Sequence, residues 1–580
     1  MNILKSGQRP TEISQQQSSS CSLLQICRMV ILVCALAIAG GADAQQADNL
    51  LVEMGCNTCH LGLKGTNTVA QKAPDLSSAG ERYEPAYLFS YLQNPESVRK
   101  YIGAARMPNY AFNEQEALAL TLFLQKQAQD AEAASVYPTE IVRGTVRSKL
   151  DAESAIKKSG CLVCHSLRGT YLGAGTPTGS ELSEIGFRLQ GRWLRKYLAS
   201  PEIFGVQPTV MPGVFYRFAA DKKTLKALDP ENAADRLNTI ARFITGTQNR
   251  KRDKLKADYK RALEMHPKMT AALGEKIFYS QNCLACHRLS GAKPPFLQNA
   301  PDLSDAGSRF NKDWLTAYLQ KPKTIRPAGF HVGSFSRMPD FNLSAQEIEK
   351  LAAALMANTK QGKNSFKPDT LSAYKMAKAK SLLDNKLSCL GCHRLGGDGG
   401  RVGPDLSQVS RRLQAGYINK IIRSPQAVSK HGGMPKVAMP EKHRALIINY
   451  MIQQHIKSEP APRASLVENE PSFFQRAEGV KALYEKNCAS CHGLKGDGEG
   501  FNAAFLPTKP TSFADAGHMR TRPDDTLFDG IYAGGYILNK SHTMPPWGKT
   551  LTTQEIRALV QYIRTFCKCS QPAWAGDGMK

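Results

Sequence analysis

The sequence has 580 residues, enough for about four domains of ordinary size, and its formal net charge at pH 7 is +26. So basic a surface attracts acidic partners or anionic membrane surfaces at long range, and nucleic acid is the usual first interpretation. An export signal and the cysteine motifs described below argue against nucleic acid. Ten of the 15 cysteines belong to those motifs, which excludes a fold held together by many disulfides.

The first 44 residues have the features of a secretory signal peptide. Arg28 precedes an apolar run over residues 29–39, and an Ala-x-Ala motif at residues 42–44 predicts cleavage before Gln45. The apolar run is too short to span a bilayer, and no later segment of the sequence reaches that length. The sequence therefore predicts a mature protein without a transmembrane helix, located in the periplasm or outside the cell.

Five copies of the motif Cys-x-x-Cys-His organise the rest of the chain. This motif is the attachment sequence of c-type haem: two thiols on one face of a helical turn bind the vinyl groups, and the adjacent His binds the iron. We therefore expect five covalently bound haem c groups. The expected attachment residues are Cys56, Cys59, Cys161, Cys164, Cys283, Cys286, Cys389, Cys392, Cys488 and Cys491. The expected proximal iron ligands are His60, His165, His287, His393 and His492.

The first four motifs are each followed by the same series of elements, which indicates internal duplication. A stretch that ends in Leu-Ser comes first, at residues 74–77, 180–183, 301–304 and 404–407. An amphipathic helix follows, and it ends at a proline, at Pro95, Pro201, Pro322 and Pro425. A Met-Pro pair and a closing helix complete each repeat. Capping boxes are expected at residues 344–347 and, in the fifth segment, at residues 552–555.

The order of these elements resembles that of a class I cytochrome c. In that family an N-terminal helix carries the haem motif, a Met loop follows, and a C-terminal helix crosses the first helix. The resemblance implies an all-α fold of five tandem class I cytochrome c domains, each packed around one covalent haem. It also implies that each proximal His donates its second ring N–H to a backbone carbonyl. The expected carbonyls lie near Pro74, Ser180, Pro301, Pro404 and Pro510.

Changes in composition indicate where the domains begin and end. The five domains are predicted at residues 45–140, 141–250, 251–365, 366–458 and 473–570. Residues 459–472 combine prolines with mixed charge, so we expect a linker there. This linker predicts that the fifth domain moves relative to the other four.

The sixth ligand of each iron decides whether a haem only carries electrons or also binds small molecules. Of the 12 His, seven lie outside the motifs, and none of these lies in the first two domains. A Met-Pro pair follows every proximal His by 41 to 52 residues, which favours a thioether sixth ligand throughout. The expected ligands are Met107, Met211, Met338, Met434 and Met544.

Some of these assignments have rivals. Met439 competes with Met434, and Met519 competes with Met544. Two further alternatives, on the third and fourth haems, are His331 and His431. Cys567 and Cys569 lack a following His, so they form a strained disulfide, stay reduced or bridge to a partner.

Five closed haems of relatively high potential indicate an electron carrier that passes electrons from haem to haem in sequence. Its expected partners are redox proteins outside the cytoplasm, and the basic surface favours acidic or membrane-bound ones. An enzyme is the alternative: di-haem peroxidases and thiosulfate dehydrogenases also join cytochrome c domains, but one of their haems has an open or exchangeable sixth site. A Met at the expected place in every domain favours the carrier. A third interpretation is an electron-transfer subunit of a membrane oxidoreductase.

Overall fold

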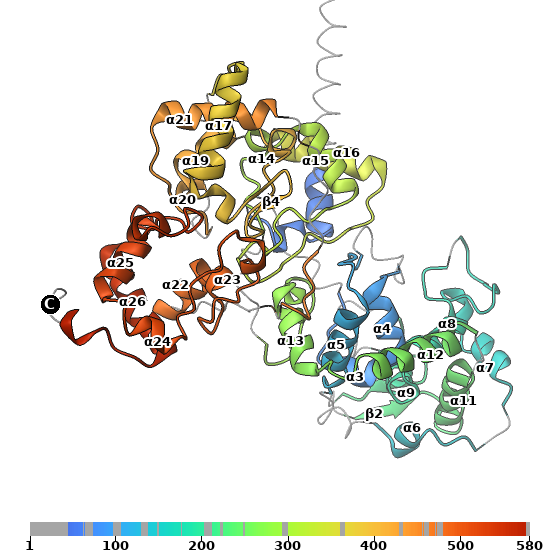
Figure 1. Ribbon diagram of the computed structural model, residues 1–580. Helices are drawn as coiled ribbons and strands as arrows, with labels where there is room; N and C mark the ends of the chain where they lie inside the picture. Colours follow the sequence, from blue (N-terminus) through green and yellow to red (C-terminus); the bar gives the residue numbers. More distant parts are fainter. Residues whose placement is uncertain are drawn as a thin grey trace, which may run out of the picture.

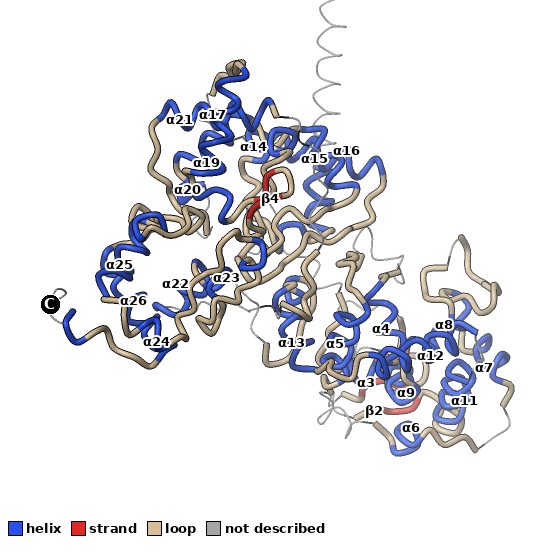
Figure 2. Tube along the Cα trace, in the orientation of Figure 1, coloured by secondary structure: helices blue, strands red, loops and turns tan. Residues whose placement is uncertain are grey.

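Helices joined by long loops make up almost all of the computed structural model (Figure 2). It describes residues 45–61, 63, 73–96, 106–128, 137–147, 150–175, 177–201, 211–220, 224–246, 250–292, 300–359, 366–428, 433–454, 456, 463–469, 471 and 479–575. None of the helices in these ranges has the length and apolar character that crossing a bilayer requires. The predicted signal peptide, residues 1–44, lies outside the described residues.

We number the motif-bearing segments one to five in chain order. Segment one comprises a helix over residues 45–53, η1 (Cys56–Thr58), α3 (Ala79–Arg82), α4 (Pro85–Gln93) and α5 (Glu114–Gln125). Segment two comprises α6 (Thr139–Arg143), α7 (Ala152–Lys158), η3 (Cys161–Val163), α8 (Leu182–Arg188), α9 (Gly191–Ala199), β1 (Tyr216–Phe218), β2 (Leu225–Ala227) and α11 (Ala233–Gly246). Segment three follows the connecting helix α12 (Arg250–Met265) and comprises α13 (Ala271–Ser280), η4 (Cys283–Ala285), α14 (Ala306–Arg309), α15 (Lys312–Gln320) and α16 (Ala345–Ala357).

The last two segments contain the second hairpin and the C-terminal helices. Segment four comprises α17 (Ala373–Asn385), η5 (Ser388–Gly391), β3 (Arg394–Leu395), β4 (Asp398–Gly399), α18 (Val409–Arg412), α19 (Ala415–Arg423), α20 (Pro425–Val428) and α21 (Glu441–Gln453). Segment five comprises α22 (Val480–Asn487), α23 (Ala489–His492), η6 (Ala503–Phe505), α24 (Ala516–Met519), α25 (Asp524–Ala533), η7 (Gly535–Leu538), α26 (Thr553–Cys567) and η8 (Ala573–Ala575). Both hairpins are antiparallel, with Tyr216 opposite Ala227 and Arg394 opposite Gly399.

The two predicted capping boxes start the closing helices of segments three and five. In α16 the Ser344 hydroxyl accepts a hydrogen bond from the Glu347 amide, and the Glu347 carboxylate accepts one from the Ser344 amide. Thr552 and Glu555 make the same reciprocal pair at the start of α26. These bonds satisfy amide groups that the helix itself leaves unpaired.

Segments one and three are joined where the first helix of segment three packs across the last helix of segment one. The first helix of segment three, α13, packs against α5, the last helix of segment one (Figure 1). Gly274 lets the backbones approach, because a Cβ there would lie 1.9 Å from the carbonyl oxygen of Ala119. Beside this contact, the rings of Phe123 and Phe278 are 5.2 Å apart.

The first helix of segment one in turn packs into segment three, so the two segments exchange their first helices. We call the two resulting bodies the exchanged units. The helix over residues 45–53 contributes Leu51 to the core that contains Leu303 and Leu351 of segment three. This arrangement differs from the tandem prediction, since ranges 45–140 and 251–365 do not each fold on themselves. Counted from the first Cys of each motif, Gly274 of α13 corresponds to Ala47 in the helix over residues 45–53, so the two first helices differ at the closest point of this crossing.

Polar contacts tie the two exchanged units together on both sides. Arg106, just before the first Met-Pro pair, donates to the Glu347 carboxylate at 2.8 Å. Arg337, just before the third pair, donates to the Glu116 carboxylate at 2.7 Å, and both side chains are buried. Between these pairs, the amide of Asn109 donates to the carbonyl of Asp340, which is part of a short antiparallel bridge.

Each exchanged unit also pairs with a neighbouring segment. Gln190 of segment two donates to the carbonyls of Gly80 and Tyr83, next to α4. Gln414 of segment four makes the same two bonds, to the carbonyls of Gly307 and Phe310. Segments one to four therefore form two similar pairs of units, which the exchanged helices connect.

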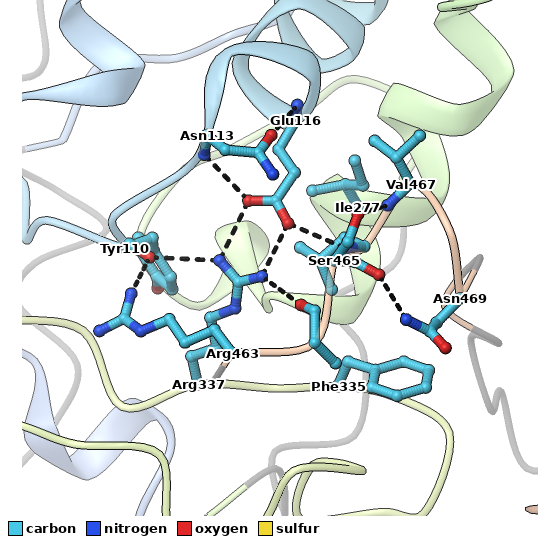
Figure 3. A network of polar contacts seen from close by, with 12 residues as sticks. Tyr110, Asn113, Glu116, Ile277, Phe335, Arg337, Arg463, Ser465, Val467 and Asn469 are labelled. Atoms are coloured by element: carbon cyan, nitrogen blue, oxygen red, sulfur yellow. Dashed lines mark hydrogen bonds and ion pairs between the residues drawn. The ribbon is translucent and has the colours of Figure 1, made fainter. Parts of the chain in front are cut away.

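The predicted linker before segment five packs against the exchanged units. Leu466 is fully buried, and its amide donates to the Glu116 carboxylate at 2.9 Å. Arg463 donates to the carbonyl of Tyr110 at 2.7 Å (Figure 3). The described part of the linker, residues 463–469 and 471, is therefore packed at a buried ion pair.

Segment five ends in a short disulfide loop. Cys567, the last residue of α26, is bonded to Cys569. This is one of the three states that the sequence left open for these two cysteines.

We predict that Gly274→Ala destabilises the exchanged units by about 1–3 kcal/mol, because the added Cβ forces α13 away from α5. Denaturant unfolding of the haem-loaded protein, followed by circular dichroism, measures the change. Gly246→Ala is the matched control, since this helical glycine has no atom within 4 Å of an added Cβ. Equal stability of the two variants would contradict the packing of α13 on α5.

Candidate haem sites

The same backbone turn positions the thiols in all five motifs. The amide of the motif His donates to the carbonyl of the first Cys at 2.9–3.0 Å, which closes one helical turn. In four motifs this turn is a short 3₁₀ helix, and in segment five it lies in α23. Residues i and i+3 of such a turn share a face, so both thiols point to the same side.

A backbone carbonyl fixes the ring of every motif His. The Nδ1–H groups of His165 and His393 donate to the carbonyls of Ser180 and Pro404 at 2.8 and 2.7 Å. These two predicted carbonyls are confirmed within their own segments. The bond leaves Nε2 as the nitrogen that can bind a metal.

The exchange changes two of the predicted carbonyl partners. His60 donates to the carbonyl of Pro301 at 2.8 Å, and His287 donates to that of Pro74 at 2.9 Å. The sequence identified both carbonyls but assigned each to the wrong His, since it assumed that each segment folds on itself. In segment five the acceptor is Thr511, at 3.0 Å, and not Pro510, because this segment lacks the Leu-Ser loop of the others.

Burial keeps these groups in their neutral forms. It lowers the pKa of His60, His393 and His492, so their imidazoles are neutral at neutral pH and can act as metal ligands. Burial also raises the pKa of the thiols, for example to about 12 for Cys56 and Cys488. The thiols of Cys56 and Cys488 are therefore not reactive thiolates.

Two large cavities contain three of the motifs. The first has a volume of about 200 Å³ and is lined by Cys56, Cys59 and His60 of segment one and by Met338 of segment three. His331 is not among its lining residues, so Met338 is the better candidate ligand there.

The second cavity has a volume of about 420 Å³ and spans two sites. Its lining includes His287 with Met107, and His165 with Met211. The predicted pairs His60/Met107 and His287/Met338 are therefore exchanged in the same way as the helices.

The remaining candidate ligands lie in segments four and five. Met439 packs against the core that segment four shares with segments one and three, and the carbonyl of Met434 accepts a hydrogen bond from the Gln426 side chain at 3.0 Å. His431 lies outside the described residues. In segment five Met519 is fully buried in α24, whereas Met544 is partly buried at the edge of the core.

Buried arginines test whether these cavities suit haem. Arg309, Arg326 and Arg412 line the first cavity. Burial and neighbouring guanidinium groups lower the pKa of Arg326 to about 10 and that of Arg412 to about 9. The Nε atoms of Arg82 and Arg188, which line the second cavity, are buried without a hydrogen-bond partner among the described residues.

Buried guanidinium groups require an anionic partner, and a haem carries two propionate carboxylates. The residues present therefore fit haem. When bound, its iron would supply one-electron oxidation and reduction. The sequence analysis missed these arginines, although each of the first four repeats has one at the same place, five residues after Leu-Ser, at Arg82, Arg188, Arg309 and Arg412.

The motifs lie in a spatial order that differs from their order in the chain. Motifs two and three share the second cavity. Motifs three and one meet at their cysteines: Asn282 and Cys286 line the first cavity, and Asn282 Nδ2 donates to Cys59 Sγ at 3.5 Å.

Two further links extend this spatial order through segments four and five. Arg412 of segment four lines the first cavity, and its positive charge, after burial, is the next largest cause that lowers the pKa of His393. Motifs four and five meet at Asn502, whose Nδ2 donates to the Gly391 carbonyl at 2.9 Å and approaches Cys491 Sγ at 3.2 Å. The spatial order is two, three, one, four, five.

Comparison with known proteins agrees with this site chemistry. A family model described as cytochrome c matches residues 45–128 and 271–358. A second model, described as cytochrome C oxidase, cbb3-type, subunit III, matches residues 475–563. No solved structure was found to match the chain. The chain therefore contains cytochrome c domains, which bind haem c covalently, and it is a haem-based electron-transfer protein.

Proposed function

We propose that the protein is an exported pentahaem c-type cytochrome that conducts electrons between redox proteins outside the cytoplasm. The observation that carries this proposal is that the five motifs neighbour one another in the order two, three, one, four, five, through shared cavities, hydrogen bonds and Arg412. Contacts between successive sites keep each electron transfer short. Export rests on the signal-peptide features of residues 1–44, and cytochrome c domains are typically found outside the cytoplasm.

The proposed ligand pairs follow the exchanged arrangement. They are His165/Met211, His287/Met107, His60/Met338, His393/Met434 and His492/Met544. The shared cavities support the first three pairs. A carbonyl bond orients each His, and buried arginines supply positive charge for the propionates of at least the first three sites.

Electron paramagnetic resonance of the oxidised, fully loaded protein tests the closed-haem assignment. We predict five low-spin signals of the His/Met type, because every site has a candidate thioether ligand. Measured iron and haem content supplies the stoichiometry. One stoichiometric high-spin haem would instead indicate an open iron and an enzyme of the peroxidase or sulfur-compound dehydrogenase type.

Removing one haem at a time tests which Met serves which iron. In a Cys56→Ser/Cys59→Ser background, which cannot attach the first haem, we predict that Met107→Ala creates one high-spin haem, because Met107 faces His287. Met338→Ala is the matched control and should add no high-spin signal there, since Met338 faces His60. In a Cys283→Ser/Cys286→Ser background the two results should be reversed. The opposite pattern would show that each Met serves its own segment.

A further inference from the structure

We call the side of each motif that carries its two cysteines the cysteine edge. The cysteine edge of motif two is more exposed than those of the other four motifs. The residue just before the second Cys is buried in segments one, three, four and five, at Thr58 (2 % exposed), Ala285 (4 %), Gly391 and Ser490 (9 %). The same position in segment two is Val163, which is 57 % exposed. Cys164 beside it is the one exposed member of the ten motif cysteines.

The other four edges are buried because they meet in pairs. The edges of motifs one and three cover each other, as the bond from Asn282 to Cys59 shows. Segment five covers the edge of motif four so closely that a Cβ at Gly391 would lie 2.0 Å from the carbonyl oxygen of Thr543. The edge of motif two is the uncovered end of the series.

The cysteine edge of motif four, which segment five covers, shows what kind of surface can cover the exposed edge of motif two. Gly400 donates its amide to the Leu390 carbonyl at 2.8 Å and lies against Asn502 of segment five. In segment two Leu172 makes the same bond to the Leu162 carbonyl at 2.8 Å. Leu172 is 53 % exposed, so an apolar side chain faces solvent where a cytochrome c segment covers the related site.

Two lysines and one ion-paired arginine lie beside this edge. Lys157 and Lys158 end α7, four and three residues before Cys161, and both are exposed. Arg168 is exposed and forms an ion pair with Glu153 at 3.2 Å. We call the set Val163, Cys164, Leu172, Lys157, Lys158 and Arg168 the site-two edge.

We propose that the site-two edge is the docking surface for an acidic c-type cytochrome domain that presents its own cysteine edge. The proposal rests on the proposed function, because it makes motif two the end of the electron path. The contacts between motifs one and three and between motifs four and five supply the geometry, and Lys157 and Lys158 supply the charge complementarity. A second copy of the chain fits less well, since a symmetric contact would place both pairs of lysines together.

The test uses the haem-loaded full chain and an acidic monohaem class I cytochrome c as the probe. Stopped-flow mixing of the reduced probe with the oxidised chain gives the second-order rate constant. We expect Val163→Glu and Lys157→Glu/Lys158→Glu each to lower it about tenfold or more at low salt, because both place negative charge on the docking surface. Leu228→Glu is the matched control: Leu228 is 49 % exposed in the same segment, next to the β1–β2 hairpin, and its variant should stay within about twofold of the parent.

Two further measurements separate the alternatives. Carbodiimide cross-linking to the acidic probe should give peptides that contain Lys157 or Lys158. Rates for Val163→Glu and the lysine variant equal to that of Leu228→Glu, or cross-links confined to segment five, would overturn the proposal. So would sedimentation showing a dimer of the chain that Val163→Glu dissociates. Titration with dithionite and ferricyanide counts the electrons that each variant accepts, so loss of the electron-transfer function itself would appear there and not only with the probe.

Discussion

Gly274 allows α13 to cross α5 at a separation that no side chain would permit, since a Cβ would lie 1.9 Å from the Ala119 carbonyl oxygen. Both exchanged units need such a pair of helices, because the first helix carries the haem motif and the last helix covers the core. The first helix of segment one carries Ala47 at the position that corresponds to Gly274, and its Cβ would collide with the Ala119 carbonyl at the same crossing. The exchanged pairing places the two motifs edge to edge, with Asn282 against Cys59.

Two central sites are therefore built jointly by two segments. His60 takes its carbonyl from Pro301 and faces Met338, while His287 takes its carbonyl from Pro74 and faces Met107. The buried pair Arg337–Glu116 connects both units to the linker at Leu466, so loss of either partner would leave a buried charge uncompensated. Stability and site geometry are thus coupled across more than 300 residues of the chain, from Glu116 to Leu466.

Local features of the sequence predicted the carbonyls of Pro74, Ser180, Pro301 and Pro404 and the capping boxes of α16 and α26, because each depends on a few neighbouring residues. The exchange could not be predicted in this way. It depends on which of two first helices reaches α5, and the difference between them at this crossing is one residue, Gly274 against Ala47, whose contact with Ala119 becomes visible only in the structure. The prolines before segment five indicate an irregular backbone, but they do not show that Leu466 is buried beside Glu116.

An experimental structure of the haem-loaded protein, with iron positions located by anomalous scattering, tests the exchanged arrangement most directly. The account predicts that the iron bound by His60 lies beside the Pro301 carbonyl and has Met338 on its other side. It also predicts that the five irons follow the order two, three, one, four, five. An iron held between His60 and Met107, with the Pro74 carbonyl behind the ring, would contradict the exchange and restore five domains that each fold on themselves.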